Sequence, residues 1–310
     1  MKIARVFPRK TKASPTDDLA FFGPPGFWPP EVDEVHISVA FTYDMKIAGD
    51  LAKEWNHVAP VKIGGPALGE PSGEFVPGRY IKPGYVITSR GCPNTCWFCS
   101  VWKREPRLIE LPIPEGWNLL DDNILACSEG HIRKVFSMLK HQPHRAQFTG
   151  GLEAKLLRDW HIDLLNDLRP GRIFFAYDTD DDYEPLVEAA RMVFAAGFLS
   201  PASNNVRCYC LIGYKGDTFA AAEKRMRQVL ELGMFPMAMV WRNKKGERSP
   251  EWISFAWLWS RPACINAMKR EAKLANCGCA GCDEKTRGDD YERATNHIFS
   301  PDGAGDPGRA

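Results

Sequence analysis

The sequence lacks the features of a membrane protein and of a strongly charged one. No apolar run approaches the length needed to cross a bilayer, so we expect no membrane-spanning helix. An excess of charge of one sign is also missing, because 40 Lys and Arg stand against 39 Asp and Glu. Electrostatic capture of bulk nucleic acid or of an anionic membrane is therefore not favoured, although a neutral average is compatible with a local basic groove.

An export signal and an internal repeat are also missing. Residues 1–8 contain no hydrophobic signal-peptide segment, which predicts a cytoplasmic protein. Ten cysteines in such a chain predict metal ligation by reduced thiols rather than disulfides. The 310 residues, 44% of them hydrophobic, suffice for one large domain or two smaller ones with a sizeable core.

Three of the cysteines lie in one short segment, residues 88–99. They have the spacing C-x3-C-x2-C and are Cys92, Cys96 and Cys99. An apolar run at 85–87 predicts a strand before them, and Gly91 and Pro93 then break regular structure. The three thiols are therefore predicted to lie on a tight loop that follows a strand.

Three thiolates on one loop point to an iron–sulfur cluster with an open position. Such clusters normally have four cysteine ligands, so three leave one iron free to bind a substrate. A structural zinc site would need a fourth ligand, and no other cysteine or histidine lies within ten residues on either side. A disulfide with one spare thiol remains an alternative, although nothing in the sequence suggests an oxidising compartment.

The segment 88–99 resembles the cluster loop of the radical S-adenosylmethionine (SAM) enzymes. The family pattern is C-x3-C-x-aromatic-C, and Phe98 fills the aromatic position. The sequence TSRGCP is similar to the branch that often carries an N-terminal cobalamin-binding domain. The resemblance implies a [4Fe–4S] cluster on Cys92, Cys96 and Cys99, with SAM chelating the open iron. It also implies reductive cleavage of SAM to a 5′-deoxyadenosyl radical, with flavodoxin or ferredoxin as electron donor.

The first 80 residues predict an irregular arm followed by a small α/β unit. Residues 1–30 are rich in proline and glycine, which disfavours regular pairing. Strands are predicted at 35–41 and 58–63 around a helix at 44–56, with parallel pairing and a right-handed crossover. This unit resembles the end of a cobalamin-binding domain but is too short and lacks the D-x-H-x-x-G signature, which predicts a truncated cap without cobalamin. Two histidines here are predicted to be structural, His36 and His57.

From residue 81 onward, strand and helix signals alternate. The predicted strands are 85–89, 118–121, 146–149, 172–177, 206–212 and 235–241. The predicted helices are 129–141, 153–168, 182–196 and 217–232. Apolar strands that alternate with helices favour a parallel sheet covered by helices. The resemblance, which covers about residues 58–241, implies a partial (β/α)6 radical SAM barrel with its chemistry at the carboxyl ends of the strands.

The sequence thus predicts an α/β chain with three parts. Residues 1–80 form the arm and the truncated Rossmann-like cap, and residues 81–245 form the radical SAM core barrel. Residues 246–310 form an aromatic and cysteine-rich extension with a poorly ordered tail.

Polar residues follow several predicted strands. Asp121, Asp122 and Asn123 end the second strand, where the resemblance implies contact with the amino and carboxylate end of SAM. The usual G-G-E of the family is absent here, and a helix N-cap is the alternative role. Glu153 follows two glycines and can accept hydrogen bonds from the ribose or the SAM amine, or act at a helix start. Asp178 is the first polar residue past the fourth strand, and the acidic residues after it are predicted to be helix-start charges.

The turn after the fifth strand resembles the family motif I-x-G-x-P-G-E-T. Gly213 matches the motif glycine, whereas Lys215 and Asp217 replace its proline and glutamate. The resemblance implies that this turn packs on the adenine of SAM, which Phe98 also helps to seat.

The other cysteines allow more than one role. Cys208 and Cys210 share one strand face, so a thiol could donate a hydrogen atom if that face lines the barrel, or both belong to the core. Cys127 is predicted to be a core residue. A second metal, zinc or an auxiliary iron–sulfur cluster, or simply reduced thiols, is predicted for the C-terminal set Cys264, Cys277, Cys279 and Cys282.

The function that the sequence favours is a radical SAM enzyme that removes a hydrogen atom from a substrate. The substrate class stays open between a small molecule, a nucleotide and a peptide, and no catalytic residue is assigned. The alternatives are a non-catalytic iron–sulfur or zinc protein and a nucleic-acid-binding module that uses the basic, cysteine-containing C-terminal segment.

Overall fold

The computed structural model describes residues 1–69, 75–199, 204–243, 245–261 and 264–268. The chain forms two compact units, Met1–Trp257 and Leu258–Ala310. Both sheets described below belong to the first unit. None of the described helices has the length and apolar character that a membrane span requires. The predicted domain boundaries after residues 80 and 245 stay predictions.

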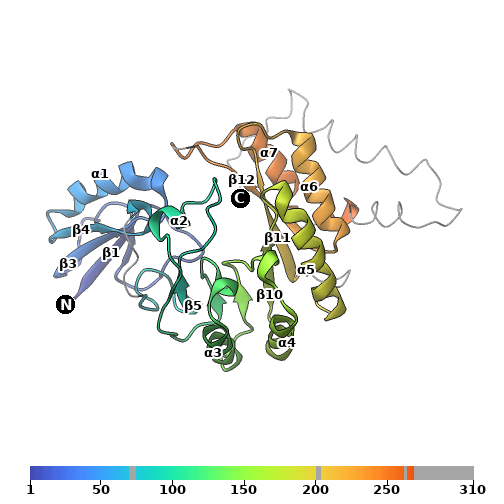
Figure 1. The fold of residues 1–310 in the computed structure, drawn as a ribbon. Helices are drawn as coiled ribbons and strands as arrows, with labels where there is room; N and C mark the ends of the chain where they lie inside the picture. The colour runs from blue at the N-terminus through green and yellow to red at the C-terminus, as the bar shows by residue number, and fades with distance from the viewer. Residues whose placement is uncertain (70–74, 200–203, 244, 262–263, 269–310) are drawn as a thin grey trace, which may run out of the picture. The chain divides into compact units, whose positions relative to one another are not determined.

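The first sheet has four parallel strands in the order β2-β1-β3-β4 (Figure 1). Its strands are β1 (Ile3–Phe7), β2 (Ala20–Phe22), β3 (Glu34–Ser38) and β4 (Val61–Gly64). Helix α1 (Met45–Trp55) connects β3 to β4. The predicted strand–helix–strand unit and its parallel pairing are confirmed.

The prediction of an irregular arm over residues 1–30 is wrong for two segments. β1 lies in the middle of the sheet, and β2 pairs with it. The reason is that the prolines begin at Pro8, so the apolar run before it keeps its N–H groups for pairing with β3.

One face of this sheet is covered by α1. Ala48, Leu51 and Trp55 of the helix are buried in one cluster with Val35 and Ile37 of β3. The alternate residues of β3, which are Glu34, His36 and Ser38, are polar and point to the opposite face.

The second sheet has six parallel strands in the order β12-β11-β10-β9-β8-β5. Its strands are β5 (Tyr85–Val86), β8 (Asn118–Leu119), β9 (Gln147–Phe148), β10 (Arg172–Ala176), β11 (Val206–Ile212) and β12 (Phe235–Val240). The main helices are α3 (Glu129–Lys140), α4 (Asp159–Leu168), α5 (Tyr183–Ala195) and α6 (Phe219–Glu231). Each of the six predicted strands and four predicted helices has a counterpart. The predicted strand 85–89 ends at Val86, with Ser89 in another sheet, and the predicted helix 153–168 begins at Asp159.

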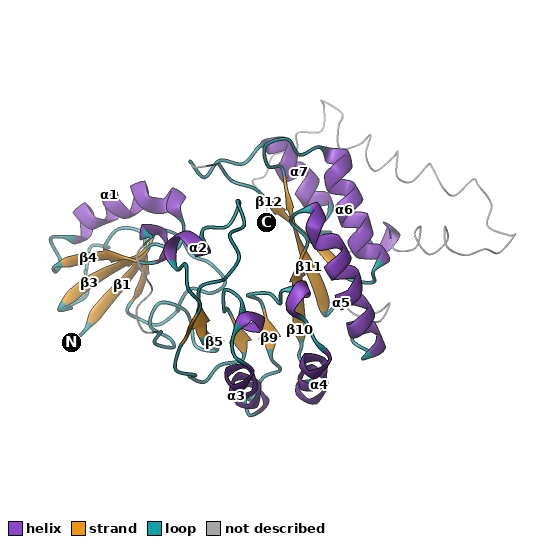
Figure 2. Cartoon of the chain, viewed as in Figure 1, coloured by secondary structure: helices purple, strands orange, loops and turns teal. Residues whose placement is uncertain are grey.

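The order of these strands follows the chain, so every crossover moves in the same direction. Right-handed crossovers then place all the helices on one face of the sheet. Figure 2 shows α3, α4, α5 and α6 along the outer side of the curving strands. The carboxyl ends of the strands consequently meet at one edge, where polar residues from successive strands come together.

Smaller elements complete the unit. β6 (Ser89–Arg90) pairs antiparallel with β7 (Ile109–Glu110), and α2 (Val101–Arg104) lies between them in the chain. Helix α7 (Pro250–Leu258) follows β12. Short 3-10 helices are η1 (Thr42–Asp44), η2 (Pro66–Leu68), η3 (Ile124–Ala126), η4 (Ala154–Leu156) and η5 (Asp180–Asp182).

The ends of β8 and β9 approach so closely that a glycine is needed between them. A Cβ added to Gly150 would lie 2.3 Å from the backbone oxygen of Asp121. Gly150 therefore serves the close approach of two strand ends.

We expect Gly150→Ala to destabilise the protein because backbone, not a flexible side chain, occupies the space of the new methyl group. A loss of about 1–3 kcal/mol is typical of such overpacking, and a thermal melt measures it. The matched control is Gly130→Ala, which meets no atom within 4 Å and lies inside α3. That variant should be as stable as the parent or about 0.5–1 kcal/mol more stable. Equal melting temperatures for both variants would contradict this account.

Candidate functional site

The three cysteines of the loop lie immediately after β6 and are all free, partly exposed thiols. Burial raises the pKa of the Cys96 and Cys99 thiols, and the neighbouring cysteines raise both further. The three sulfurs are therefore within electrostatic reach of one another. Among the described residues, no group of three or more His, Cys, Asp or Glu is arranged to hold a single metal ion.

Asp121 anchors the start of this loop. Its carboxylate accepts hydrogen bonds from the Thr88 backbone N–H (2.6 Å), the Thr88 hydroxyl (2.6 Å) and the Ser89 hydroxyl (2.7 Å). Asp121 is 1% exposed; its burial raises the pKa of the carboxyl, and the bonds from Thr88 and Ser89 oppose that rise. Both carboxylate oxygens are engaged within the protein, so Asp121 positions the loop.

Asp122 holds the loop at a second point, the backbone of Gly91. It accepts a hydrogen bond from the Gly91 N–H (2.9 Å) and lies 3.5 Å from the guanidinium of Arg104 on α2. The N-cap role considered for residues 121–123 is not seen, because Ser128 caps α3 and accepts from the His131 N–H. The start of the loop and the helix that follows it are therefore tied to the same strand end.

Asn123 faces the cysteines. Its side-chain amide donates to Glu153 (2.5 Å) and lies 3.4 Å from the sulfur of Cys92. The other carboxylate oxygen of Glu153 accepts from Asn94, which lies between the first two cysteines (2.9 Å). Asn123 Oδ1 is buried and has no hydrogen-bond partner among the described residues. The structure thus brings Asn123 and Glu153, from two successive strand ends, together at the cysteine loop.

The turn after β11 is built on a buried ion pair. Gly213 has a φ of 74°, which favours glycine, and its N–H donates to Asp217 (2.8 Å). Asp217 also pairs with Arg225 of α6 at 2.8 Å, with side chains 0% and 4% exposed. The aspartate that replaces the motif glutamate therefore closes this turn.

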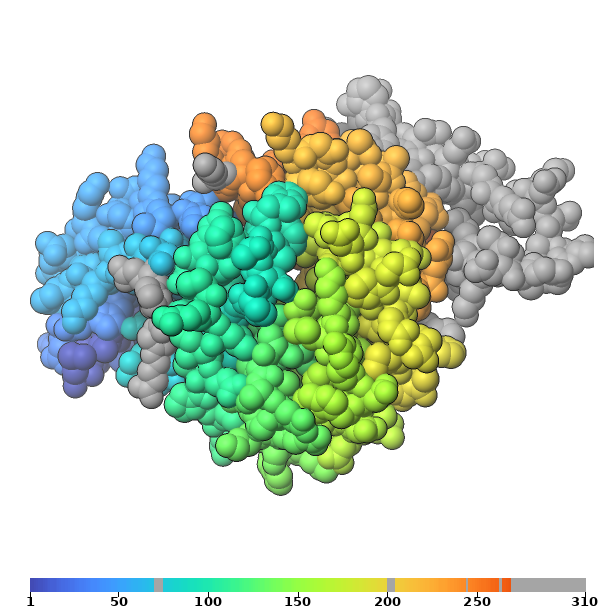
Figure 3. Space-filling model, in the orientation of Figure 1, coloured from blue at the N-terminus to red at the C-terminus, as the bar shows by residue number. Residues whose placement is uncertain are grey.

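Aromatic contacts connect that turn to the cysteine loop. Trp97, between the second and third cysteines, makes an edge contact with Tyr214, with ring centroids 5.3 Å apart. Phe98 makes an edge contact with Trp97 at the same separation. Figure 3 shows the teal segment around the cysteine loop beside the yellow-green segment near the start of α5, and the Cys96 thiol lies within electrostatic reach of Asp182 there.

Asp178 joins the ends of β10 and β11. Its carboxylate accepts a hydrogen bond from the Leu211 N–H (3.0 Å), and burial raises its pKa to about 6. The acidic residues that follow are helix-start groups as predicted, since Asp182 accepts from the N–H groups of Asp178 and Thr179.

Cys208 and Cys210 face the helices and are core residues. Phe175 is the register partner of Cys208, so the two side chains share a face of the sheet. Tyr177 is on that face too, two residues beyond Phe175, and its hydroxyl donates to Gln228 of α6 (2.9 Å). Both thiols are 0% exposed and lie on the helix side of the sheet, so they do not line the inner face where a hydrogen donor would be needed. Cys127 is buried as predicted.

Several contributors were not singled out from the sequence, namely Asn94, Trp97, Arg104 and Tyr214. A polar residue between two cysteines of the C-x3-C-x2-C motif, as Asn94 is, was the one available signal. Of the proposed C-terminal ligands, Cys264 is a free, partly exposed thiol, and the others lie outside the described residues: Cys277, Cys279 and Cys282.

The raised pKa of Asp178 has a consequence for stability. The folded state binds the proton more tightly than an unfolded aspartate does. This group's contribution to the free energy of unfolding therefore decreases as the pH rises from about 4 to about 6. Asp178→Asn keeps an acceptor for Leu211 but removes the buried charge. The variant should therefore gain stability relative to the parent at pH 7.5, by about 1–3 kcal/mol, but not at pH 4. Melting curves at both pH values test this, and an equal difference at both would contradict it.

Comparison with protein-family models and with curated proteins finds no match to this chain. The functional assignment therefore depends on the residues and their geometry. The observations that count are the three-cysteine loop and the strand-end residues that contact it.

Proposed function

We propose that this chain is a radical SAM enzyme that carries a [4Fe–4S] cluster on Cys92, Cys96 and Cys99. The observation that carries the proposal is the contact of Asn123 and Glu153 with the cysteine loop, at the carboxyl edge of a six-stranded parallel sheet. The finer description of that sheet as a partial (β/α)6 barrel is part of the proposal. A sequential strand order with helices on one face is what such a barrel requires.

The side chains around the loop fit this cofactor better than a zinc ion. A structural zinc site takes four ligands, and the loop supplies three cysteines with no other cysteine or histidine within ten residues. Each thiolate of an iron–sulfur cluster binds a different iron, so the ligands can stand further apart. The amide of Asn123 next to Cys92 matches the hydrogen bonds to sulfur that tune such clusters.

The same side chains fit the amino-acid end of SAM. Asn123 Oδ1 is a buried acceptor without a partner among the described residues, and it adjoins the Glu153 carboxylate. An unsatisfied buried acceptor is costly, and a ligand ammonium would satisfy it. In this proposal Asn123 and Glu153 bind the SAM amine, whereas Asp121 and Asp122 hold the loop in place.

When bound, the reduced cluster and SAM supply a 5′-deoxyadenosyl radical that takes a hydrogen atom from the substrate. The protein's work is to bind, to orient and to exclude water, because the cofactor carries the difficult chemistry. Trp97, Phe98 and Tyr214 form an aromatic wall between the cysteine loop and the Gly213 turn. We assign the adenine of SAM to this wall and to that turn. A flavodoxin or ferredoxin is the electron donor in this proposal.

The direct test needs no substrate. The protein is reconstituted with iron and sulfide without oxygen, given SAM and dithionite, and analysed for 5′-deoxyadenosine by mass spectrometry. We expect the product from the parent and from the control Cys127→Ala, whose thiol is buried outside the loop. The triple variant Cys92→Ala, Cys96→Ala, Cys99→Ala should lack both the cluster absorbance and the product. A parent that binds iron but leaves SAM intact would favour a non-catalytic iron–sulfur protein instead.

A second variant separates SAM binding from cluster binding. Asn123→Leu has a similar shape but removes the acceptor and the donor next to Cys92. We expect iron content to stay near that of the parent and 5′-deoxyadenosine formation to fall about 10- to 100-fold, as for residues that contact metal ligands. Asn56→Leu, an exposed asparagine at the end of α1, is the control and should behave as the parent. Unchanged product formation in Asn123→Leu would remove Asn123 from the SAM site.

A further inference from the structure

A cavity of about 540 Å³ lies at the carboxyl end of the first sheet, apart from the residues assigned above to the cluster and SAM. Its lining includes the last residues of β1, β3 and β4, which are Phe7, Ser38 and Gly64. Its volume falls within the range of about 300–1,000 Å³ that is usual for small-molecule sites. Parallel α/β sheets bind ligands at this end, where neighbouring connections leave in opposite directions. Here the chain runs from β1 toward one edge of the sheet to form β2, and from β3 toward the other edge to form β4.

The cavity is bounded on one side by the second face of this sheet, which carries Arg5, His36 and Lys62. The segment 75–81 covers that face. Arg5 of β1 donates to the backbone oxygens of Gly78 (3.2 Å) and Arg79 (2.8 Å) and so attaches the segment to the sheet. The segment consists of turns without helix or strand, and it lines the cavity through Phe75, Val76, Tyr80 and Ile81.

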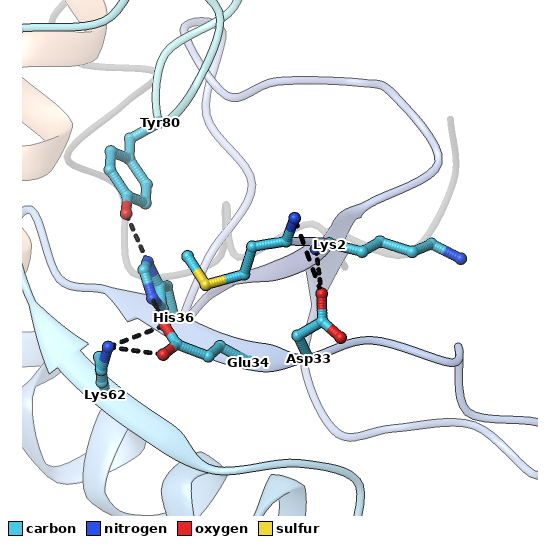
Figure 4. Close-up of polar contacts among 7 residues, drawn as sticks. Lys2, Asp33, Glu34, His36, Lys62 and Tyr80 are labelled. Atoms are coloured by element: carbon cyan, nitrogen blue, oxygen red, sulfur yellow. Dashed lines mark hydrogen bonds and ion pairs between the residues drawn. The ribbon is translucent and has the colours of Figure 1, made fainter.

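A network of polar side chains forms one wall of the cavity (Figure 4). His36 of β3 contacts the Tyr80 hydroxyl through Nδ1 (2.6 Å) and Glu34 through Nε2 (2.8 Å). Lys62 of β4 donates to both oxygens of the same glutamate (2.7 and 2.8 Å). Both ring nitrogens of His36 are engaged within the protein, so it is a structural residue as predicted. The single negative charge of Glu34 is shared between His36 and Lys62.

Cationic donors dominate the rest of the polar lining. Arg9, Lys62 and Arg90 line the cavity, and Asp44 is the one carboxylate in the lining, with Glu34 paired to Lys62 beside it. Asp44 is 1% exposed and accepts from two N–H groups of Arg9. A guanidinium has five such donors, so the described residues use two and leave three for a ligand.

The remaining lining is apolar and partly uncovered. Phe41 lines the cavity and is 39% exposed. Ile63 also lines it and is 42% exposed, with its side chain on the face opposite to that of Lys62. Exposed apolar side chains grouped at a concave site indicate a ligand with an apolar body. The donors on one side then fix its charged end.

We propose that this cavity binds an organic anion, a molecule with a flat apolar ring body and a carboxylate or phosphate group. The anionic group lies with Arg9 and Lys62, and the ring lies against Phe41. This site is independent of the proposed SAM chemistry, since none of its lining residues is a cluster ligand or contacts the SAM amine in our assignment.

The test uses 2-naphthoate as the probe and isothermal titration calorimetry on the full chain. We expect one site for 2-naphthoate and at least tenfold weaker binding of 2-naphthamide, which has the same ring without the charge. Inorganic phosphate alone should bind at least tenfold more weakly than 2-naphthoate. Equal affinities for the acid and the amide, or for the acid and phosphate, would overturn the proposed ligand class.

A pair of glycine variants locates the site. Gly64 lines the cavity, has no positive φ, and a Cβ there meets no atom within 4 Å, so Gly64→Phe fills the space without backbone strain. Gly49 in α1 is equally open but lies outside the lining, so Gly49→Phe is the matched control. We expect at least a tenfold loss of 2-naphthoate affinity in the first variant only. Equal affinity in Gly64→Phe and the parent would overturn the proposed location.

A charge variant keeps the test decisive if Gly64→Phe does not fold. Lys62 is 64% exposed in its side chain, so Lys62→Gln should leave the fold intact. We expect a several-fold loss of 2-naphthoate affinity and no change for 2-naphthamide. Lys53→Gln, on the exposed face of α1, should bind both probes as the parent does. Unchanged binding of 2-naphthoate in Lys62→Gln would contradict the role of this cation.

Discussion

The buried carboxylate of Asp121 is the constraint on which the candidate site depends. A buried charge is tolerated only where hydrogen bonds compensate its lost hydration, and Asp121 receives three of them from Thr88 and Ser89. Those donors are the residues that lead into the cysteine loop. The Asp121 backbone in turn abuts Gly150 at the end of β9. One residue therefore fixes the exits of three neighbouring parallel strands, and the loop starts from a rigid point.

Local sequence signals were sufficient to predict the architecture of the second sheet. Its strands are apolar and its helices amphipathic, so their periodicity is visible without any tertiary knowledge. Details of the site were not visible in the same way. The bond partners of Asp121 lie 32 and 33 residues away in the chain, and nothing in the spacing of residues 88–123 specifies which carboxylate points inward. The sequence therefore located Asp121, Asp122 and Asn123 correctly at a strand end. It could not predict which of them anchor the loop and which one faces the cysteines.

For the first sheet, the prediction from the sequence missed whole strands. Proline and glycine content concealed β1, although its five residues carry no proline and are mostly buried. Composition averages over a segment, whereas strand pairing depends on each N–H group, so one short run inside a proline-rich stretch is easily missed. The face that α1 leaves uncovered could not be foreseen either. It depends on Arg5 binding a segment more than seventy residues further along the chain.

The two regions of the molecule meet in the dipeptide Ser89-Arg90. The Ser89 hydroxyl bonds to Asp121, whereas the next residue, Arg90, lines the cavity of the first sheet. Side chains of adjacent strand residues point in opposite directions, so a two-residue strand can serve both regions at once.

Burial lowers the pKa of Arg90, and the charge of Asp122 opposes that shift. Asp122 therefore interacts both with the Arg90 guanidinium and with the Gly91 N–H at the start of the cysteine loop.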